Sequence, residues 1–270
     1  MTHSTTMSAR VDYHSRMQTL PAEFENAQGK ALSGLLDVPD ENPKAYALFA
    51  HCFTCGKSLG VIRNIAKQLT AEGIAVLRFD FTGLGQSEGE FAKTTFTTNT
   101  ADLVAAAEFL EREYAAPAVL IGHSLGGAAV LAAADLIPSA TCVATIGAPA
   151  EPAHIRHLLT GAAFGDGDVA EISIGGRPFK IGKQFIRDLE EHNLADRIGK
   201  LKRPLLVFHS PVDTIVGIDN AEKIFKAAKH PKSFVSLGEA DHLVSRPKDA
   251  QFLGHVLSAW AGYYVVPPAT

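Results

Sequence analysis

Short apolar runs alternate with segments of helical spacing along most of this chain. The apolar runs predict buried strands at residues 45–51, 74–80, 116–123, 141–149, 203–210 and 232–237. Helical spacing occurs at residues 60–73 and 99–114, and further helices are expected to begin near Ser124, Asp219 and Pro247. Strands joined through helices run parallel, and helices cover both faces of such a sheet. The pattern therefore predicts an α/β fold with a mostly parallel sheet.

Two regions depart from this alternation. Residues 1–20 read as a tail, and Glu23–Val38 reads as two short strands around the turn at residues 27–30. Residues 151–200 contain a possible hairpin at EISIGGRPFKI and a helix at KQFIRDLEEH. We interpret this stretch as a lid inserted into a core made of residues 21–150 and 201–270. The lid is expected over the carboxyl edge of the sheet, where open α/β sheets bind ligands.

Composition and charge exclude several classes of partner. The 270 residues carry 25 basic and 29 acidic side chains without a basic run, so neither nucleic acid nor a membrane is expected as a partner. The start of the chain has no apolar segment of signal-peptide length, and no stretch approaches a membrane span. We expect a cytoplasmic protein. Its three cysteines do not suggest a disulfide framework.

A serine motif stands where one predicted strand meets the next helix. Residues 122–126, Gly-His-Ser-Leu-Gly, fit the pattern G-x-S-x-G in its expected strand–turn–helix context. A sharp turn would lift the Ser124 hydroxyl above the sheet edge, and glycines two positions away would prevent a clash. The alternative is a tight strand–helix connection without catalysis. A serine hydroxyl also needs a base to become a good nucleophile.

The base and its orienting acid are expected after later strands, in the order serine, acid, histidine. Asp213 follows the strand at 203–210, and His242 follows the strand at 232–237. Asp213 could instead be a turn residue, and His242 a packing or surface histidine. Other side chains compete for these roles: Asp219 at a helix N-cap, Asp241 in the loop, and His209 in an auxiliary role.

Two backbone amides should hold the negative oxygen formed in acyl transfer. We predict the amide of Leu125, which follows the nucleophile, and that of Phe53, in the loop after the strand at 45–51. A plain connecting loop is the alternative for Phe53. Cys52 and Cys55 flank it as C-x-x-C, which can indicate a redox pair, but no further cluster completes a zinc site. Packing of the thiols is favoured, and no metal or cofactor is predicted.

With these residues in place, the chain resembles the α/β-hydrolase superfamily over nearly all of residues 25–262. The stretches FAHCFTCGKSL, LIGHSLGGAAVLAAA, HSPVDTIVGIDNA and ADHLVS resemble the hydrolase domain of bifunctional α/β-hydrolase/OsmC-type proteins. The resemblance implies the Ser124, Asp213 and His242 triad, the Phe53 and Leu125 amides, and a small lid. Two features depart from it. Cys52 occupies a position that is glycine in many relatives, and no OsmC-like domain follows before Thr270. The latter indicates a stand-alone form or a piece of a longer chain.

The predicted activity is hydrolysis of a small-molecule carboxylic ester through an acyl-enzyme. A small lid suggests short to medium acyl chains. Candidate substrate contacts are His123, Phe164, Ile174 and Phe179, although the lid side chains could equally pack the insertion onto the core. Amide or peptide cleavage, perhydrolysis, and a non-catalytic ligand-binding protein remain open as alternatives. The sequence does not indicate an oligomeric state.

Overall fold

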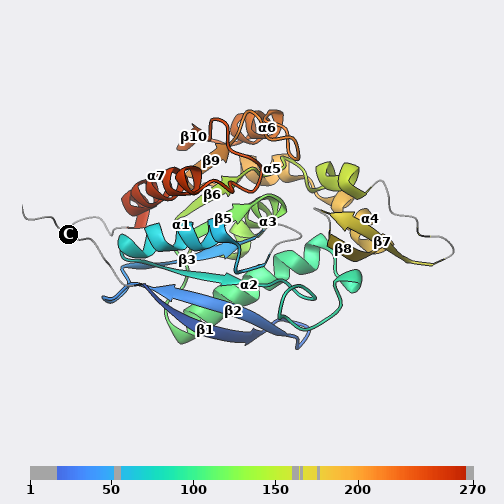
Figure 1. The fold of residues 1–270 in the computed structure, drawn as a ribbon, viewed down its shortest axis with the longest axis horizontal. Coiled ribbons are helices and arrows are strands. Elements are labelled where there is room, and N and C mark those ends of the chain that lie inside the picture. The colour runs from blue at the N-terminus through green and yellow to red at the C-terminus, as the bar shows by residue number, and fades with distance from the viewer. Residues whose placement is uncertain (1–16, 52–55, 160–163, 165–166, 175–176, 266–270) are drawn as a thin grey trace, which may run out of the picture.

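An eight-stranded sheet forms the centre of the computed structural model, which describes residues 17–51, 56–159, 164, 167–174 and 177–265. Figure 1 shows the sheet between layers of helices. From one edge to the other the strands are β1 (Gln18–Glu25), β2 (Ala31–Val38), β4 (Ile74–Phe79), β3 (Ala45–Ala50), β5 (Val119–His123), β6 (Cys142–Ile146), β9 (Leu205–His209) and β10 (Lys232–Ser236). The pairs from β4 to β10 are parallel, whereas β1 and β2 run antiparallel at one edge.

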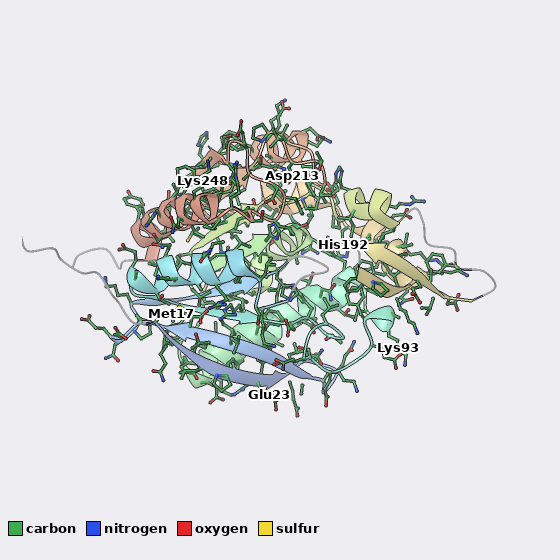
Figure 2. All side chains as sticks on the ribbon, in the orientation of Figure 1. Met17, Glu23, Lys93, His192, Asp213 and Lys248 are labelled. Carbon is green, nitrogen blue, oxygen red and sulfur yellow. The ribbon has the colours of Figure 1, made fainter. Side chains whose placement is uncertain are left out.

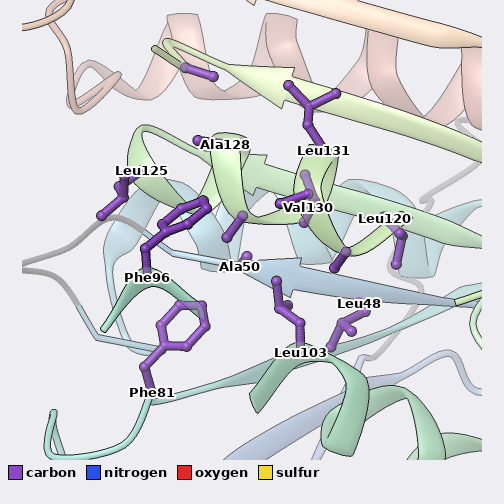
Figure 3. Packing of buried hydrophobic residues seen from close by; sticks show 14 of the residues in the cluster. Leu48, Ala50, Phe81, Phe96, Leu103, Leu120, Leu125, Ala128, Val130 and Leu131 are labelled. Carbon is purple, nitrogen blue, oxygen red and sulfur yellow. The ribbon is translucent and has the colours of Figure 1, made fainter. Parts of the chain in front are cut away.

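Helices cover both faces of the sheet, as the alternation of strands and helices predicts. On one face lie α1 (Gly60–Ala71) and α7 (Pro247–Val265), and on the other lie α2 (Phe96–Glu113), α3 (Leu125–Ala133), α5 (Leu194–Gly199) and α6 (Asp219–Ala227). The strands alternate accordingly. Leu48 and Ala50 of β3 pack with α2 and α3, while Ala47 and Phe49 pack with α1 and α7. Figure 3 shows the first of these clusters, where Leu125 and Phe96 meet above the end of β3.

Two elements begin earlier than the sequence patterns predict. Strand β1 starts at Gln18, so residues 18–20 of the predicted tail belong to the sheet, where Leu20 packs against the core. Helix α2 starts at Phe96 rather than at residue 99. The Thr95 side chain accepts a hydrogen bond from the Thr98 amide (3.1 Å), and the Thr98 hydroxyl accepts one from the Thr95 amide (2.8 Å). This reciprocal capping box fixes the start of the helix.

Residues 151–200 connect β6 to β9 and contain several short elements. They contain a 3₁₀ segment (Pro152–Leu159), the antiparallel hairpin of β7 (Val169–Ile174) and β8 (Arg177–Gly182), α4 (Lys183–Glu191) and α5. The Gln184 amide donates to the carbonyl of Ala92 (2.6 Å), and the Asp188 carboxylate accepts from the amide of Thr97 (2.8 Å). Figure 1 shows β7, β8 and α4 beside the start of α2. The insertion is thus anchored on the segment that follows β4.

Within the part of the chain that the structure describes, no helix combines the length and apolar character that a membrane span requires.

Candidate active site

Ser124 lies on a sharp turn between β5 and α3, as the motif predicts. Its backbone adopts φ 55° and ψ −127°, a left-handed conformation that is unfavourable for a residue with a side chain. The Ser124 amide donates to the carbonyl of Ile146 on the neighbouring strand (2.8 Å), and the Ser124 carbonyl accepts from the amide of Gly127 (2.8 Å). The turn is therefore held from both sides, and the hydroxyl projects from the carboxyl end of the central strand.

The structure brings Asp213 and His242 to this serine. Nδ1 of His242 lies 2.7 Å from Oδ2 of Asp213, and Nε2 of His242 lies 2.9 Å from Oγ of Ser124. Both residues come from loops that follow β9 and β10, and Figure 2 labels Asp213 near α6. The three side chains form one hydrogen-bonded chain across residues that are 118 and 29 positions apart.

The surroundings keep Asp213 ionised. Burial of its side chain opposes ionisation, but the hydrogen bond and charge of His242 and the amides of Ile215 and Val216 outweigh burial and lower the pKa of Asp213. These amides donate to Oδ1, each at 2.9 Å. Oδ1 is thus occupied by the backbone, and Oδ2 is left to face the imidazole. A carboxylate held in this way fixes the ring orientation and the tautomer of a histidine base.

A glycine that sequence reasoning missed lies under the acid–base pair. Gly147 follows β6 with φ 54°, and a Cβ there would lie 3.3 Å from Oδ2 of Asp213 and 3.5 Å from Nδ1 of His242. Only glycine adopts this conformation without strain, so the position leaves space for the pair. The signal in the sequence is a glycine inside the predicted strand at 141–149, and nothing local distinguishes it from other glycines near strand ends.

Two histidines at strand ends are buried beside the three residues. His123 ends β5 and is 1% exposed; its Nε2 lies 2.7 Å from the carbonyl oxygen of His242. His209 ends β9 and is fully buried, with Nε2 2.7 Å from the carbonyl oxygen of Val216. Burial, followed by the neighbouring His242, lowers the pKa of His123 to about 3, and burial likewise lowers the pKa of His209. A contact of His123 with substrate stays a prediction.

One of the two predicted oxyanion donors falls in the described structure. Leu125 opens α3, and the first amides of a helix have no partner within it and favour negative charge. Phe53 lies outside the described residues, as do Cys52 and Cys55.

The segment after that loop is anchored by a buried ionic network that sequence reasoning also missed. Asp80 accepts from the amide of Lys57 (2.8 Å) and from its ammonium group (2.5 Å), while Arg78 donates to the Lys57 carbonyl and pairs with Asp37. The available signal was the charge of Arg78 and Asp80 in the otherwise apolar run at 74–80.

The structure describes the side chains of two of the three lid residues proposed for substrate contact. Phe164 and Phe179 are partly buried and pack against the main core cluster, and the ammonium group of Lys183 lies 5.7 Å from the centre of the Phe164 ring. The side chain of Ile174 lies outside the described residues. Both the packing of these side chains between insertion and core and their contact with substrate stay predictions.

One cysteine falls within the described residues. Cys142 is a buried free thiol on β6, and burial raises its pKa to about 12. Among the side chains that the structure describes, no three His, Cys, Asp or Glu residues are grouped so that they could hold a metal ion.

A strained serine at a strand–helix turn, paired with a histidine and an aspartate in this order, defines the class of serine hydrolases built on an α/β sheet. Comparison with known proteins agrees. The family described as serine aminopeptidase, S33, matches residues 41–160. The esterase domain of a Rhodothermus marinus protein is 55% identical, with a TM-score of 0.80 over 93% of this chain and all of that domain. The chain therefore belongs to the α/β-hydrolase superfamily.

More distant similarities support the fold. Est1E from Butyrivibrio proteoclasticus, solved with ferulic acid, has a TM-score of 0.77 and is 21% identical over 90% of this chain and 99% of its own. Human monoglyceride lipase is 33% identical over 121 residues, 44% of this chain and 39% of the lipase. The uncharacterised protein YfhR of Salmonella typhi is 25% identical over 65% of this chain and 57% of its own length. The matches to curated relatives span 39% to 72% of the length of those proteins.

Proposed function

We propose that the protein is a serine esterase that hydrolyses small carboxylic esters through an acyl-enzyme on Ser124. The observation that carries this proposal is the hydrogen-bonded chain from Oδ2 of Asp213 through His242 to Oγ of Ser124, at 2.7 and 2.9 Å. The likeness to an esterase domain at 55% identity supports the choice of bond, and the partial match to a monoglyceride lipase agrees with it.

The geometry supports the following route for the proton. Nε2 of His242 removes the proton of the Ser124 hydroxyl as Oγ attacks the ester carbonyl. The amide of Leu125, joined by that of Phe53, would stabilise the oxyanion of the tetrahedral intermediate. Nε2 of His242 then returns the proton to the departing alcohol, which leaves an ester on Ser124. Water attacks that ester with His242 again as the base and regenerates the serine.

Exposed apolar side chains on the two loops that carry Asp213 and His242 support a substrate with apolar groups. Val212 precedes Asp213, Ile215 follows it closely, and Leu243 follows His242; these residues are 52%, 38% and 40% exposed. Exposed apolar residues gathered on the loops that carry a site are typical of surfaces that contact a ligand. The lid, at residues 151–200, is small, and we therefore propose acyl chains of short to medium length.

Turnover of p-nitrophenyl esters by the purified protein tests the proposal. Acetate and butyrate esters should be hydrolysed faster than the palmitate ester, and a fluorophosphonate should label Ser124. Ser124→Ala should retain the fold and lose about 10⁴-fold or more in kcat/KM. Ser236→Ala, at an exposed serine on the outer strand β10, is the matched control and should retain wild-type activity. Ester turnover by Ser124→Ala close to that of the wild type would contradict the proposal, and best activity on palmitate would contradict the chain length.

Cleavage of a peptide or amide bond is the second candidate, and the match to the serine aminopeptidase family favours it. Both activities use the same three side chains, so the geometry does not separate them. Turnover of an ester, an aryl amide and an amino-acid p-nitroanilide, together with peracid formation from acetate and peroxide, should be measured on one preparation. Faster cleavage of the anilide would make the protein a peptidase, and faster peracid formation a perhydrolase. The absence of both turnover and labelling would indicate a ligand-binding protein.

A further inference from the structure

The two loops that carry the acid and the base are each tied to the end of a core strand by a buried histidine. His123 at the end of β5 faces the carbonyl of His242, and His209 at the end of β9 faces the carbonyl of Val216, each at 2.7 Å. β6 lies between these strands in the sheet, so the two contacts flank the acid–base pair. The sequence pattern offers His209 only as a candidate for an auxiliary role.

The tautomer of each ring follows from its partner. A carbonyl oxygen only accepts hydrogen bonds, so Nε2 must carry the proton in both rings. Among the residues that the structure describes, Nδ1 of His123 and Nδ1 of His209 have no hydrogen-bond partner. Both rings are buried, and burial favours the neutral form, so each acts as a single neutral donor. Neither ring therefore places a second positive charge beside His242.

These contacts act on the backbone that holds the catalytic side chains. His242 is fixed at its side chain by Asp213 and at its carbonyl by His123. The base loop also includes Val244 at φ 50°, which is unfavourable for a β-branched residue, so its conformation must be maintained by contacts of this kind. In the acid loop, the carbonyl of Val216 accepts from His209 while its amide donates to Oδ1 of Asp213.

We propose that His123 and His209 are positioning residues, whose Nε2–H groups hold the loops of His242 and Asp213 so that the imidazole reaches Ser124. This inference rests on the proposed function, because it needs an assayable turnover. A misplacement of about 1 Å in a reacting group costs on the order of 100-fold in rate. Loss of either donor should therefore lower kcat more than it raises KM.

Glutamine and asparagine separate positioning from packing. The amide nitrogen of glutamine occupies roughly the place of Nε2, whereas that of asparagine corresponds to Nδ1 and does not reach the carbonyl. We expect kcat of His123→Gln to stay within about tenfold of the wild type and kcat of His123→Asn to fall about 100-fold. The same pair at His209 should behave alike. Thr145→Val, at a buried hydroxyl on β6 that has no partner among the described residues, is the control and should keep wild-type kcat.

Active-site titration with a fluorophosphonate should set the concentration of folded enzyme in every sample. The inference is supported if, at both positions, kcat of the glutamine variant exceeds kcat of the asparagine variant by tenfold or more. A smaller ratio of the two kcat values at either position overturns the inference for that residue. If an asparagine variant does not fold, the leucine variant takes its place under the same criterion. If the wild type neither turns over an ester nor reacts with the fluorophosphonate, the proposed function fails, which is distinct from failure of the inference alone.

Discussion

Gly122 and Gly126 lie so close together that a Cβ added to Gly122 would overlap the carbonyl oxygen of Gly126. A Cβ on Gly126 would in turn overlap the carbonyl oxygens of Ala50 and His51 at the end of β3. The obstructing atoms belong to the backbone, which cannot move aside as a side chain can. The two glycines of G-x-S-x-G are therefore required by the close approach of β5, α3 and β3, and not by turn formation alone.

Gly126→Ala should therefore destabilise the protein and disrupt the turn at Ser124. We expect a loss of about 2–4 kcal/mol in the free energy of unfolding, a typical cost of overpacking in a buried site. Gly262→Ala on α7 is the control, because nothing lies within 4 Å of a Cβ there. That variant should gain up to about 1 kcal/mol from the higher helix propensity of alanine. Urea unfolding measures both, and equal stability of the two variants would contradict this account.

Features of the fold and the site that a local sequence pattern determines can be predicted from the sequence alone. Apolar runs bounded by turns gave the strands, and the G-x-S-x-G motif with the order of Asp213 and His242 gave the three side chains that the structure brings together. These features depend on neighbouring residues, or on the rule that parallel strands end at one edge of a sheet.

Contacts between distant segments of the chain could not be predicted from local sequence patterns. His123 meets the backbone of a residue 119 positions away, and Gly147 contributes only the space that it leaves. The start of helix α2 at Phe96 was not predicted, because Thr98 occupies the capping-box position that glutamate or glutamine usually holds. The sequence signature of the capping box is therefore weak here. Each of these depends on which loops meet after folding, and one sequence does not contain that information locally.

Asp213→Asn should leave the fold intact and lower kcat by about 10⁴-fold. The substitution keeps an oxygen for the amides of Ile215 and Val216 but presents an NH₂ group to Nδ1 of His242, which selects the wrong tautomer. Asp219→Asn at the exposed start of α6 is the control and should retain activity. Steady-state kinetics with p-nitrophenyl butyrate checks both. A kcat for Asp213→Asn within tenfold of the wild type would assign the acid elsewhere, with Asp241 as the next candidate.

Lys57→Met should change how the free energy of unfolding depends on pH, because it removes the charged partner of Asp80. Burial opposes ionisation of Asp80, but the hydrogen bonds and charge of Lys57 outweigh it and lower the pKa of Asp80 in the folded state. The stability from this pair is therefore present above the unfolded pKa of about 3.9 and is lost as pH falls through the folded pKa. Without Lys57, Asp80 is a buried carboxylate whose ammonium partner is absent, and its pKa rises.

At neutral pH the Lys57→Met variant should lose about 3–5 kcal/mol relative to the wild type. The difference should shrink as pH falls through the raised pKa of Asp80 in the variant, because protonation removes the unpaired buried charge. Lys223→Met removes an exposed pair with Asp219 and should change stability little at any pH. Urea unfolding across this range measures all three proteins. A difference that stays constant with pH would mean that Lys57 stabilises the protein by packing rather than by its charge.

Leu243→Ser should weaken binding of esters with apolar groups without altering the chemical step. Leu243 follows His242 and is 40% exposed, so substitution leaves the core intact while it removes apolar surface beside the site. Full burial of a leucine side chain contributes about 1.5–3 kcal/mol, and partial burial by a substrate would raise KM by about threefold to tenfold. The increase in KM should be larger for a benzyl ester than for a methyl ester of the same acid.

Phe252→Ser, at an exposed aromatic residue on α7, is the matched control and should leave KM unchanged. An equal rise in KM for both esters would show that Leu243 does not discriminate apolar groups. Its position between His242 and the strained Val244 would then point to a role in holding the base loop.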